Sequence, residues 1–570
     1  MKILLISLFI SLITICSSRA ETPNLVWAKA IPDCGGDGAK SIITDKFQNV
    51  YITGHFDHAA DFDPGNGTVI LTPKATHDIY ILKLDSFGNF VWVKTIGGTE
   101  SSYAESITSD ALGNVIVTGF FNGTADFDPG TGAFTMTSTG NDNAFILKLD
   151  QNGNFTWAKQ IEGDGFSVAR SITLDAASNI YLTGSFSGKT DFDPGKGVYT
   201  LSSSGDTRDL FIEKLDESGN FMWAKQIGGI AADYGCSISL DPLGNVYTVG
   251  QYFGTVDFDP GAEIYNLNSI DNQISRFILK LTTTGEFLWA RQIQAASIDY
   301  GCAIAVDKSG NVYTTGGFAG IVDVDPGDGI FTLISSGGAD IFILKLDNAG
   351  NFVWAKTIGS ELFDYAQSIA LDDSSNVYTT GTFRATADFD PGEQEFILTP
   401  SNSDDEIFIS KLDTYGNFQW ALGIGSKSND IGNSISVDHK GYVYSTGAFS
   451  STVDFKSSGK TTRLTTDKAP GVFIQKLDQI TNSTNSNEFF TRQSTSIYPN
   501  PASGFVTFDF GRQISNGRIK LMNFLGQTVA EISEVNGHSF LIDISAQPKG
   551  MYYLEVYSAG NSERVKVVKS

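Results

Sequence analysis

Short runs of alternating hydrophobic and polar residues, separated by turns, recur along most of the chain. Between residues 90 and 157 this pattern predicts four strands, at Phe90–Ile96, Ser106–Thr108, Val115–Phe120 and Phe145–Leu149. Asp-x-x-Gly-Asn segments at Asp110–Asn114 and Asp150–Asn154 fall between strands. Gly and Asn accept the positive φ that tight loops require, so these segments predict antiparallel hairpins.

This unit is repeated with a fixed period. The tryptophans are spaced 65 or 66 residues apart, at Trp27, Trp92, Trp157, Trp223, Trp289, Trp354 and Trp420. Such a period indicates one supersecondary unit copied along the chain. Four antiparallel strands in each of seven units predict an all-β fold, a seven-bladed β-propeller.

The two ends of the repeat region predict how the propeller closes. The strand Leu25–Ile31 has no repeat before it, and the last repeat ends at Phe473–Asp478 without a tryptophan strand of its own. We expect the N-terminal strand to complete the last blade, which removes both sheet edges. The tryptophans alternate with Phe and Ile, a pattern that predicts packing between blades; the alternative is a set of sugar-stacking platforms.

The segments outside the repeats predict the domain organisation. Residues 1–20 have a charged start, an apolar stretch and small residues before Ala20, as in a secretory signal peptide. The propeller is expected over 21–478, followed by an Asn/Thr/Ser-rich linker over 479–493. Residues 494–570 contain short alternating strands with Gly-bearing turns, which predict a small C-terminal β-sandwich.

Charge narrows the range of partners. The formal net charge is −25, and residues 494–570 hold seven Lys/Arg against six Asp/Glu, so the repeat region carries nearly all of it. Nucleic acid and anionic membrane surfaces are unfavourable partners, because binding phosphate groups requires a basic face. Cations and partners with basic patches are compatible with this charge.

Three cysteines remain after the expected signal peptide: Cys34, Cys236 and Cys302. An odd number in an exported chain leaves at least one thiol free or paired between molecules. Cys236 and Cys302 occupy the same position in neighbouring repeats, at the start of the expected innermost strands. They form a disulfide if their Cα atoms come within about 7 Å, and otherwise remain free thiols.

Two parts of the chain resemble known families. The Gly-Asn-Val-Tyr-x-Thr-Gly and Phe-Ile-x-Lys-Leu-Asp elements, over roughly residues 25–478, resemble the SBBP-type β-propeller repeats of exported bacterial proteins. The Tyr-Pro-Asn-Pro opening at Tyr498 and the Pro-Lys-Gly-Met-Tyr-Tyr run at Pro548 resemble the type A C-terminal sorting domain of the Bacteroidetes type IX secretion system. This second resemblance implies Sec export to the periplasm, transport by the type IX machinery across the outer membrane, and release or surface attachment. The repeat resemblance implies a fold and no particular activity.

One polar motif, Asp-Phe-Asp-Pro-Gly, lies between the second and third strands of most units. Two Asp at i and i+2 on an extended chain point the same way, and their oxygens with nearby carbonyls could ligate Ca²⁺. Alternatively, the Asp side chains cap the turn backbone while Pro-Gly bends it and Phe packs below. In the fifth unit Val324 replaces the Phe, and in the seventh unit Lys456 replaces the second Asp. The candidate calcium ligands are Asp61, Asp63, Asp126, Asp128, Asp191, Asp193, Asp257, Asp259, Asp323, Asp325, Asp388 and Asp390.

No catalytic set stands out in the sequence. The histidines have no metal-ligand spacing, and nucleophile-elbow and phosphate-loop motifs are missing. Acidic residues recur in every unit, whereas an active site needs one differentiated set. We therefore expect a noncatalytic cell-surface or secreted module that binds protein or polysaccharide through the loops after each tryptophan strand, for example Gly98–Glu105 and Ser426–Asn433. A polysaccharide-degrading or otherwise hydrolytic propeller and a structural surface component are the alternatives.

Overall fold

The computed structural model describes residues 22–569, apart from 37, 206, 270–272, 294–300, 402–403, 458, 480–495, 499–503, 524–527 and 559–560. The chain divides into two compact units between residues 481 and 482. The expected signal peptide (1–20) and residues 480–493 of the expected linker lie outside the described residues. Every named element of the described chain is a β-strand, so the all-β prediction is confirmed.

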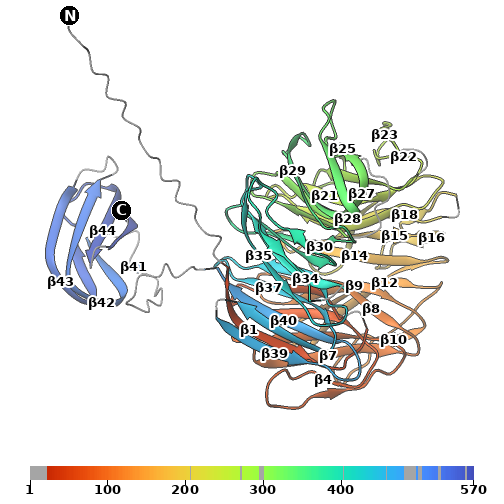
Figure 1. Cartoon of the computed structure of the whole chain (residues 1–570), viewed down its shortest axis with the longest axis horizontal. Coiled ribbons are helices and arrows are strands. Elements are labelled where there is room, and N and C mark those ends of the chain that lie inside the picture. Colours follow the sequence, from red (N-terminus) through yellow and green to blue (C-terminus); the bar gives the residue numbers. More distant parts are fainter. Residues whose placement is uncertain are drawn as a thin grey trace, which may run out of the picture. The chain divides into compact units, whose positions relative to one another are not determined.

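The first unit is built from four-stranded antiparallel sheets, called blades here, which follow one another in chain order around a common axis (Figure 1). The described residues contain seven of these blades. Their innermost strands are β2 (Ala39–Thr44), β8 (Ser102–Ser109), β14 (Ser167–Leu174), β20 (Tyr234–Leu240), β26 (Cys302–Val306), β30 (Tyr365–Leu371) and β36 (Ile431–Val437). The second strands are β3 (Val50–Phe56), β9 (Val115–Phe121), β15 (Ile180–Phe186), β21 (Val246–Tyr252), β27 (Val312–Asp323), β31 (Val377–Phe383) and β37 (Val443–Phe449).

The outer half of each blade contains a buried third strand and an outermost tryptophan strand. The third strands are β6 (Asp78–Leu84), β12 (Asn143–Leu149), β18 (Asp209–Leu215), β24 (Ser275–Leu281), β28 (Thr332–Leu346), β34 (Glu406–Leu412) and β40 (Gly471–Asp478). The fourth strands are β7 (Phe90–Gly98), β13 (Phe155–Gly163), β19 (Phe221–Ile227), β25 (Phe287–Ile293), β29 (Phe352–Ile358), β35 (Phe418–Ile424) and β1 (Asn24–Ile31). The innermost strands begin on one face of the propeller, called here the loop face because the longer loops lie there. They end on the opposite face, called here the turn face, which carries the Asp-x-x-Gly-Asn turns.

Between its second and third strands each blade adds a small excursion, called here the motif hairpin. These hairpins are β4 (Ala60–Asp61) with β5 (Ile70–Leu71), β10 (Thr124–Asp126) with β11 (Thr135–Thr137), β16 (Lys189–Asp191) with β17 (Thr200–Ser202), β22 (Thr255–Asp257) with β23 (Asn266–Asn268), β32 (Ala387–Asp388) with β33 (Ile397–Leu398), and β38 (Thr452–Ser457) with β39 (Lys460–Thr465). In the fifth blade the hairpin is continuous with β27 and β28. The hairpin strand β10 also pairs with β7, the outermost strand of the preceding blade.

Strand β1 lies beside β40 in the seventh blade, although the two come from opposite ends of the repeat region (Figure 1). Their antiparallel register runs from Asn24 opposite Asp478 to Ile31 opposite Val472. At the innermost strands, the amide of Ile42 in blade one donates to Ser434 Oγ of blade seven over 3.2 Å. The same bond joins Ile107 to Ser41 over 3.4 Å between blades one and two. The seventh blade therefore meets the first through the contact that joins consecutive blades.

The tryptophans tie each blade to the next one. Trp92 Nε1 and Lys83 Nζ of blade one both donate to the carbonyl of Gln151 in blade two, over 3.3 and 2.9 Å. Trp27 and Lys476 of blade seven both donate to the carbonyl of Ser86 in blade one, over 3.4 and 3.3 Å. These contacts and the buried hydrophobic clusters between blades show that the tryptophans serve packing.

Where the chain leaves the last blade, the side chain of Gln479 supplies a hydrogen-bond acceptor that a turn carbonyl supplies in the other blades. Lys411 Nζ and the Tyr378 hydroxyl donate to Gln479 Oε1 over 2.8 and 2.9 Å, while Gln479 Nε2 donates to the Gly441 carbonyl over 2.6 Å. In other blades the lysine reaches a backbone carbonyl of the turn between the third and fourth strands. Because the chain does not make that turn after β40, a side-chain amide supplies the acceptor.

The second unit is one antiparallel sheet of β41 (Ser496–Tyr498), β42 (Phe505–Asn523), β43 (Thr528–Asp543), β44 (Gly550–Ser558) and β45 (Asn561–Lys569). The sequence predicts separate short strands, whereas β42 and β43 are long and pair through several register shifts, so bulges take the place of expected turns. Val506, Leu521 and Leu554 lie in its core. Residues 499–501 of the Tyr-Pro-Asn-Pro segment and the Gly-Gln turn at 526–527 lie outside the described residues.

Candidate functional site

The Asp-Phe-Asp-Pro-Gly copies form hydrogen-bonded turns. Asp61 Oδ1 accepts the amides of Asp63 and Val69 over 3.1 and 2.7 Å, and Asp63 Oδ1 accepts the amide of Gly65 over 2.8 Å. The intervening Phe62 is fully buried. The same three bonds recur at the copies that begin at Asp126, Asp191, Asp257, Asp323 and Asp388. This geometry agrees with the alternative in which the Asp side chains cap the turn backbone.

The structure places the calcium candidates in pairs, one pair in each motif hairpin that carries both Asp residues. Among the residues it describes, no group of three or more His, Cys, Asp or Glu side chains is arranged to hold a metal ion. In the seventh copy, Arg463 and Lys456 pair with Asp454 and hold the pKa of its carboxyl well below its usual range. A lysine ammonium thus lies where a second carboxylate would face calcium.

We expect the melting temperature of the purified protein to be the same in EDTA and in millimolar Ca²⁺. One oxygen of each motif carboxylate already accepts backbone amides, so a metal would compete with existing bonds. A ligand that binds only the folded state raises the melting temperature. Differential scanning calorimetry measures it, and a clear rise with Ca²⁺ but not with Mg²⁺ would contradict this prediction and support the calcium hypothesis.

Three buried carboxyl groups lie where blades meet on the loop face. Burial raises the pKa of Asp233 to about 7 and those of Asp340 and Asp430 to about 6. A second carboxyl in the adjoining blade raises each pKa further, from Asp209, Asp364 and Glu406 respectively. Each of the three also accepts a backbone amide, for example Asp233 from Gly229 over 2.7 Å.

The free energy of unfolding should therefore rise as the pH falls from 8 to 5. A raised carboxyl pKa means that the folded state binds protons that the unfolded chain releases, so this stability is present at low pH and is lost as the pH rises through 6 and 7. Denaturant titrations at both pH values measure the difference. Asp233→Asn should reduce it, whereas Asp373→Asn, at an exposed ion pair with Lys308, should leave it unchanged. Equal pH dependence in both variants would contradict the assignment.

One position of the repeat carries a different residue type in nearly every blade. It lies on the innermost strands, which surround the axis. Six innermost strands carry an extra, bulged residue at this place, and Cys302 takes the corresponding place in β26. The residues are Lys40, Glu105, Arg170, Cys236, Cys302, Gln367 and Asn433. Asn433 Nδ2 donates to the Ala39 carbonyl over 3.0 Å, which joins blade seven to blade one. The innermost strands therefore carry a differentiated set of side chains, which the recurrence of acidic residues in every unit did not indicate.

A cleft of about 820 Å³ opens on the loop face across blades two, three and four. The Arg208 guanidinium lies over the Phe166 ring at 4.0 Å from its centroid, and 5.8 Å from that of Tyr234. Burial raises the pKa of the Asp142 carboxyl, and the positive charge of Arg208 opposes the rise. The other lining residues are Asn122, Asn141, Ser187, Thr207 and Ala232. This is a polar, partly aromatic site of ligand size.

The cleft is not repeated around the ring. The position of Arg208 is taken in the other blades by His77, Asp142, Ile274, Ala339, Asp405 and Pro470. The loops after the tryptophan strands, where we expected recognition, contribute Phe166 and Ala232 to its lining. The residues that flank the third strands were missed, although aligning the repeats by position would have found Arg208.

Aromatic and histidine side chains gather at the junction of blades one and two. The Tyr103 hydroxyl and His77 Nδ1 are 3.0 Å apart, and His77 Nε2 lies 3.9 Å from Asp57 Oδ2. The His55 ring lies 4.8 Å from that of Tyr103, between centroids. The sequence shows three histidines in the first repeat, at His55, His58 and His77, but their spacing alone did not predict that the His55 and His77 rings lie 5.4 Å apart between centroids.

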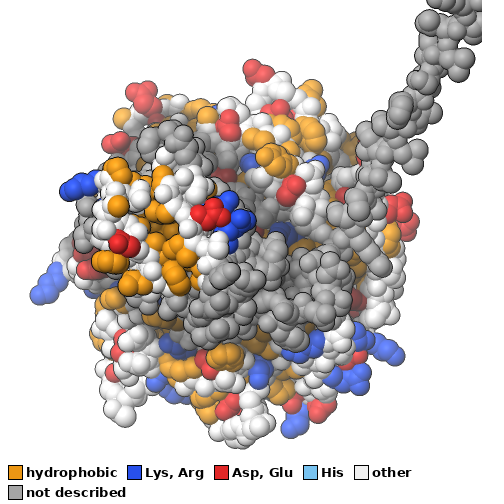
Figure 2. All heavy atoms as spheres, turned by 90° about the vertical axis from the view of Figure 1, so that its left-hand side faces the viewer, with side chains coloured by type: hydrophobic (Ala, Val, Ile, Leu, Met, Phe, Trp, Pro, Cys, Tyr) orange, Lys and Arg blue, Asp and Glu red, His pale blue; other side chains and the backbone are white. Residues whose placement is uncertain are grey.

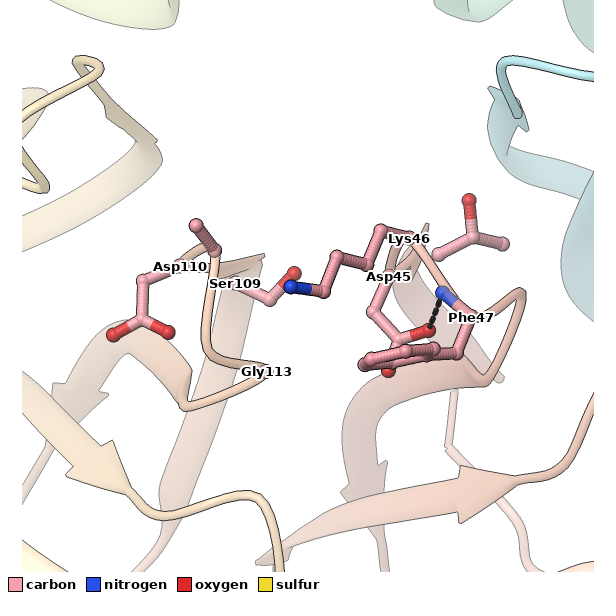
Figure 3. Close-up of a pocket in the computed structure, with 8 residues that line it drawn as sticks. Asp45, Lys46, Phe47, Ser109, Asp110 and Gly113 are labelled. Atoms are coloured by element: carbon pink, nitrogen blue, oxygen red, sulfur yellow. Dashed lines mark hydrogen bonds between the residues drawn. The ribbon is translucent and has the colours of Figure 1, made fainter. Parts of the chain in front are cut away.

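A second, smaller cavity of about 170 Å³ lies on the turn face between blades one and two (Figure 3). Asp45 Oδ1 accepts the amide of Phe47 over 2.8 Å, and the Lys46 side chain extends toward Ser109 (Figure 3). Ligand pockets usually hold about 300–1,000 Å³, so this cavity is small for a ligand. It is a gap between two repeated turns, and the loop-face cleft is the stronger candidate.

Comparisons with known proteins agree with the two-part organisation. Residues 496–570 match the secretion system C-terminal sorting domain, and residues 223–251 and 288–316 match the β-propeller repeat. Within the described part of the chain, no helix is long and apolar enough to cross a membrane.

The C-terminal unit exposes the hydrophobic side chains of Phe505, Val529 and Leu541. Figure 2 shows exposed hydrophobic side chains, in orange, among polar and charged ones.

Two curated relatives are similar over parts of their length. An uncharacterized WD repeat-containing protein of Acanthamoeba polyphaga mimivirus is 25% identical over 513 residues, covering 76% of this chain and 37% of the relative. Regulatory protein FlaEY of Caulobacter vibrioides is 23% identical over 280 residues, covering 47% of this chain and 27% of the relative. The chain thus spans about a third of the length of these relatives.

Among solved structures, Sqt1 from Chaetomium thermophilum matches with a TM-score of 0.36 and 11% identity, covering 80% of this chain and 99% of that one. The chain thus combines β-propeller repeats with a type IX secretion system C-terminal sorting domain, which indicates export across the outer membrane to the cell surface or the medium.

Proposed function

We propose that the exported propeller is a noncatalytic binding module for a neutral polysaccharide, held in the loop-face cleft of blades two to four. The observation that carries this proposal is the cleft's size and composition, since about 820 Å³ is enough for a short run of sugar rings. Its lining comes from three consecutive blades and does not recur around the ring.

The side chains of the cleft suit hydroxyl-rich ligands. Arg208 presents several N–H donors in a fixed plane, because the Phe166 ring lies against the guanidinium at 4.0 Å. Asn122 and Asn141 offer both donors and acceptors, and the Asp142 carboxyl can accept. Such groups can bond the adjacent hydroxyls of a sugar, while the Tyr234 ring supplies an apolar surface for its C–H face.

Charge favours a neutral polymer over an acidic one. A chain with a formal charge of −25 repels polyanions at long range. Arg208 does not reverse this field, because it is a single cation whose charge acts on the Asp142 carboxyl. A rigid propeller also loses little conformational entropy on binding, which helps a weak, repetitive ligand.

The proposal is tested by measuring retention of the purified protein on a panel of neutral polysaccharides, acidic polysaccharides and surface-protein extracts. We expect retention on at least one neutral polysaccharide and no release of reducing ends from it. Retention on protein extracts alone would transfer the binding role to a protein partner. Release of reducing ends would favour the hydrolytic alternative, for which the Asp57, His77 and Tyr103 cluster is the obvious place to look.

A further inference from the structure

We propose that Cys236 and Cys302 form a redox-active pair on the propeller axis, which a disulfide oxidant converts into a disulfide between blades four and five. The two cysteines occupy the same place in neighbouring innermost strands, and both are partly exposed. This site is separate from the loop-face cleft and does not depend on the proposed function.

The backbone aligns the two thiols. The amide of Ile304 in β26 donates to Ser237 Oγ in β20 over 3.4 Å, so the two innermost strands lie side by side at these residues. Cys302 stands two residues before Ile304 and Cys236 one residue before Ser237, at equivalent positions of the two strands. Cys236 is the bulged residue of its strand, since the pairing of β20 with β21 skips from Gly235 to Ser237.

A buried arginine supplies positive charge beside this pair. Arg276 is fully buried on β24, at a position that is apolar in the other blades: Ile79, Ala144, Leu210, Ile341, Ile407 and Val472. Its Nη1 donates to the Thr315 carbonyl over 3.2 Å and its Nη2 to the Gly301 carbonyl. A Cβ on Gly316 would stand 2.2 Å from Arg276 Nη1, so this glycine leaves the room that the guanidinium fills.

The charges favour the thiolate on one cysteine of the pair. The hydrogen bond from Cys302 lowers the pKa of the Cys236 thiol, and Arg170 and Arg276 lower it further against the effect of burial. Thiolates in electropositive, accessible places are the reactive ones. Cys34 is the contrast within the chain, because burial raises the pKa of its thiol to about 12.

The reaction requires an external disulfide, such as a small-molecule or protein disulfide outside the cytoplasm. The Cys236 thiolate attacks one sulfur of R–S–S–R, forming a mixed disulfide and releasing R–S⁻. The Cys302 thiol then loses its proton, and its thiolate attacks Cys236 Sγ and releases the second R–S⁻. The two cysteines lose two electrons and two protons, and the oxidant becomes two R–SH.

The first test is peptide mapping by mass spectrometry of the full-length protein, reduced and then treated with oxidised glutathione. We expect a Cys236–Cys302 cross-linked peptide and an unmodified Cys34. Cys302→Ser should stop the reaction at a glutathione adduct on Cys236, whereas Cys34→Ser should leave the cross-link unchanged. Failure to form the cross-link in the folded protein, or cross-links that involve Cys34, would overturn the proposal.

The second test compares reaction rates without requiring the cross-link. In the reduced, folded protein, iodoacetamide at pH 7 should modify Cys236 at least about tenfold faster than Cys34. Arg276→Met should slow the reaction of Cys236, and Arg276→Lys should restore part of the rate. If Arg276 variants do not fold, the wild-type ratio of the two rates still decides. Equal rates at Cys236 and Cys34 would contradict an activated thiolate.

Discussion

Deletion of residues 496–570 is expected to leave the propeller folded and trapped in the periplasm. The deleted segment matches the sorting domain and lies in a compact unit of its own, with a separate core that includes Val506, Leu521 and Leu554. Removing it therefore takes no strand from any blade. Cell fractionation and protease shaving of intact cells measure where the protein accumulates, and surface signal should fall to background.

Two controls make this result specific. The truncated protein should keep the melting temperature of the propeller, which separates loss of transport from loss of folding. Residues 482–570 fused to an unrelated periplasmic protein should carry that protein to the surface, because the segment is an address read by a receptor. Surface exposure of the truncated propeller would show that its export uses another signal.

Trp27→Ala is expected to destabilise the entire propeller by about 3–5 kcal/mol. Trp27 is 8% exposed, lies against Tyr444 at 6.4 Å between ring centroids, and donates to the Ser86 carbonyl of the first blade. The substitution thus leaves a cavity where the N-terminal strand joins the last blade and the last blade meets the first. Denaturant unfolding followed by fluorescence of the remaining tryptophans measures the loss.

A control comes from the residue that precedes the tryptophan on an equivalent outermost strand. Val91, next to Trp92 on β7, is 45% exposed, so Val91→Ala should change the free energy of unfolding by no more than about 0.5 kcal/mol. Deletion of Asn24–Ile31 should abolish folding, because the edge of β40 and two buried clusters lose their cover. A folded, soluble deletion variant would show that the seventh blade does not need β1.

The repeat pattern predicted the fold well because the signals for strands and turns are local and recur in each unit. The position of Gly and Asn in the turns and the alternation around each tryptophan fix strand ends and faces locally. The strands of the C-terminal unit were less well predicted. Its glycines and polar residues suggested turns between short strands, but β42 and β43 absorb them as register shifts within long strands.

The candidate sites were harder to predict because they arise from differences between repeats. The regular recurrence of the Asp-Phe-Asp-Pro-Gly motif led to the calcium hypothesis. In the structure, an oxygen of each of these carboxylates accepts backbone amides of the turn. Arg208, by contrast, has no motif around it, and its partners Phe166 and Tyr234 come from different blades. Recognition of such a site requires the three-dimensional neighbourhood of successive repeats.

The most direct test of the binding proposal compares two phenylalanines at the same repeat position. Phe166 supports Arg208 in the cleft of blades two to four, whereas Phe363 holds the equivalent place in blade six, beyond that cleft. Calorimetric titration of each Phe→Ala variant with the retained neutral polysaccharide would give the two affinities. A loss of at least about tenfold for Phe166→Ala, with Phe363→Ala close to wild type, is the expected result. Equal affinities for both variants would contradict binding in this cleft.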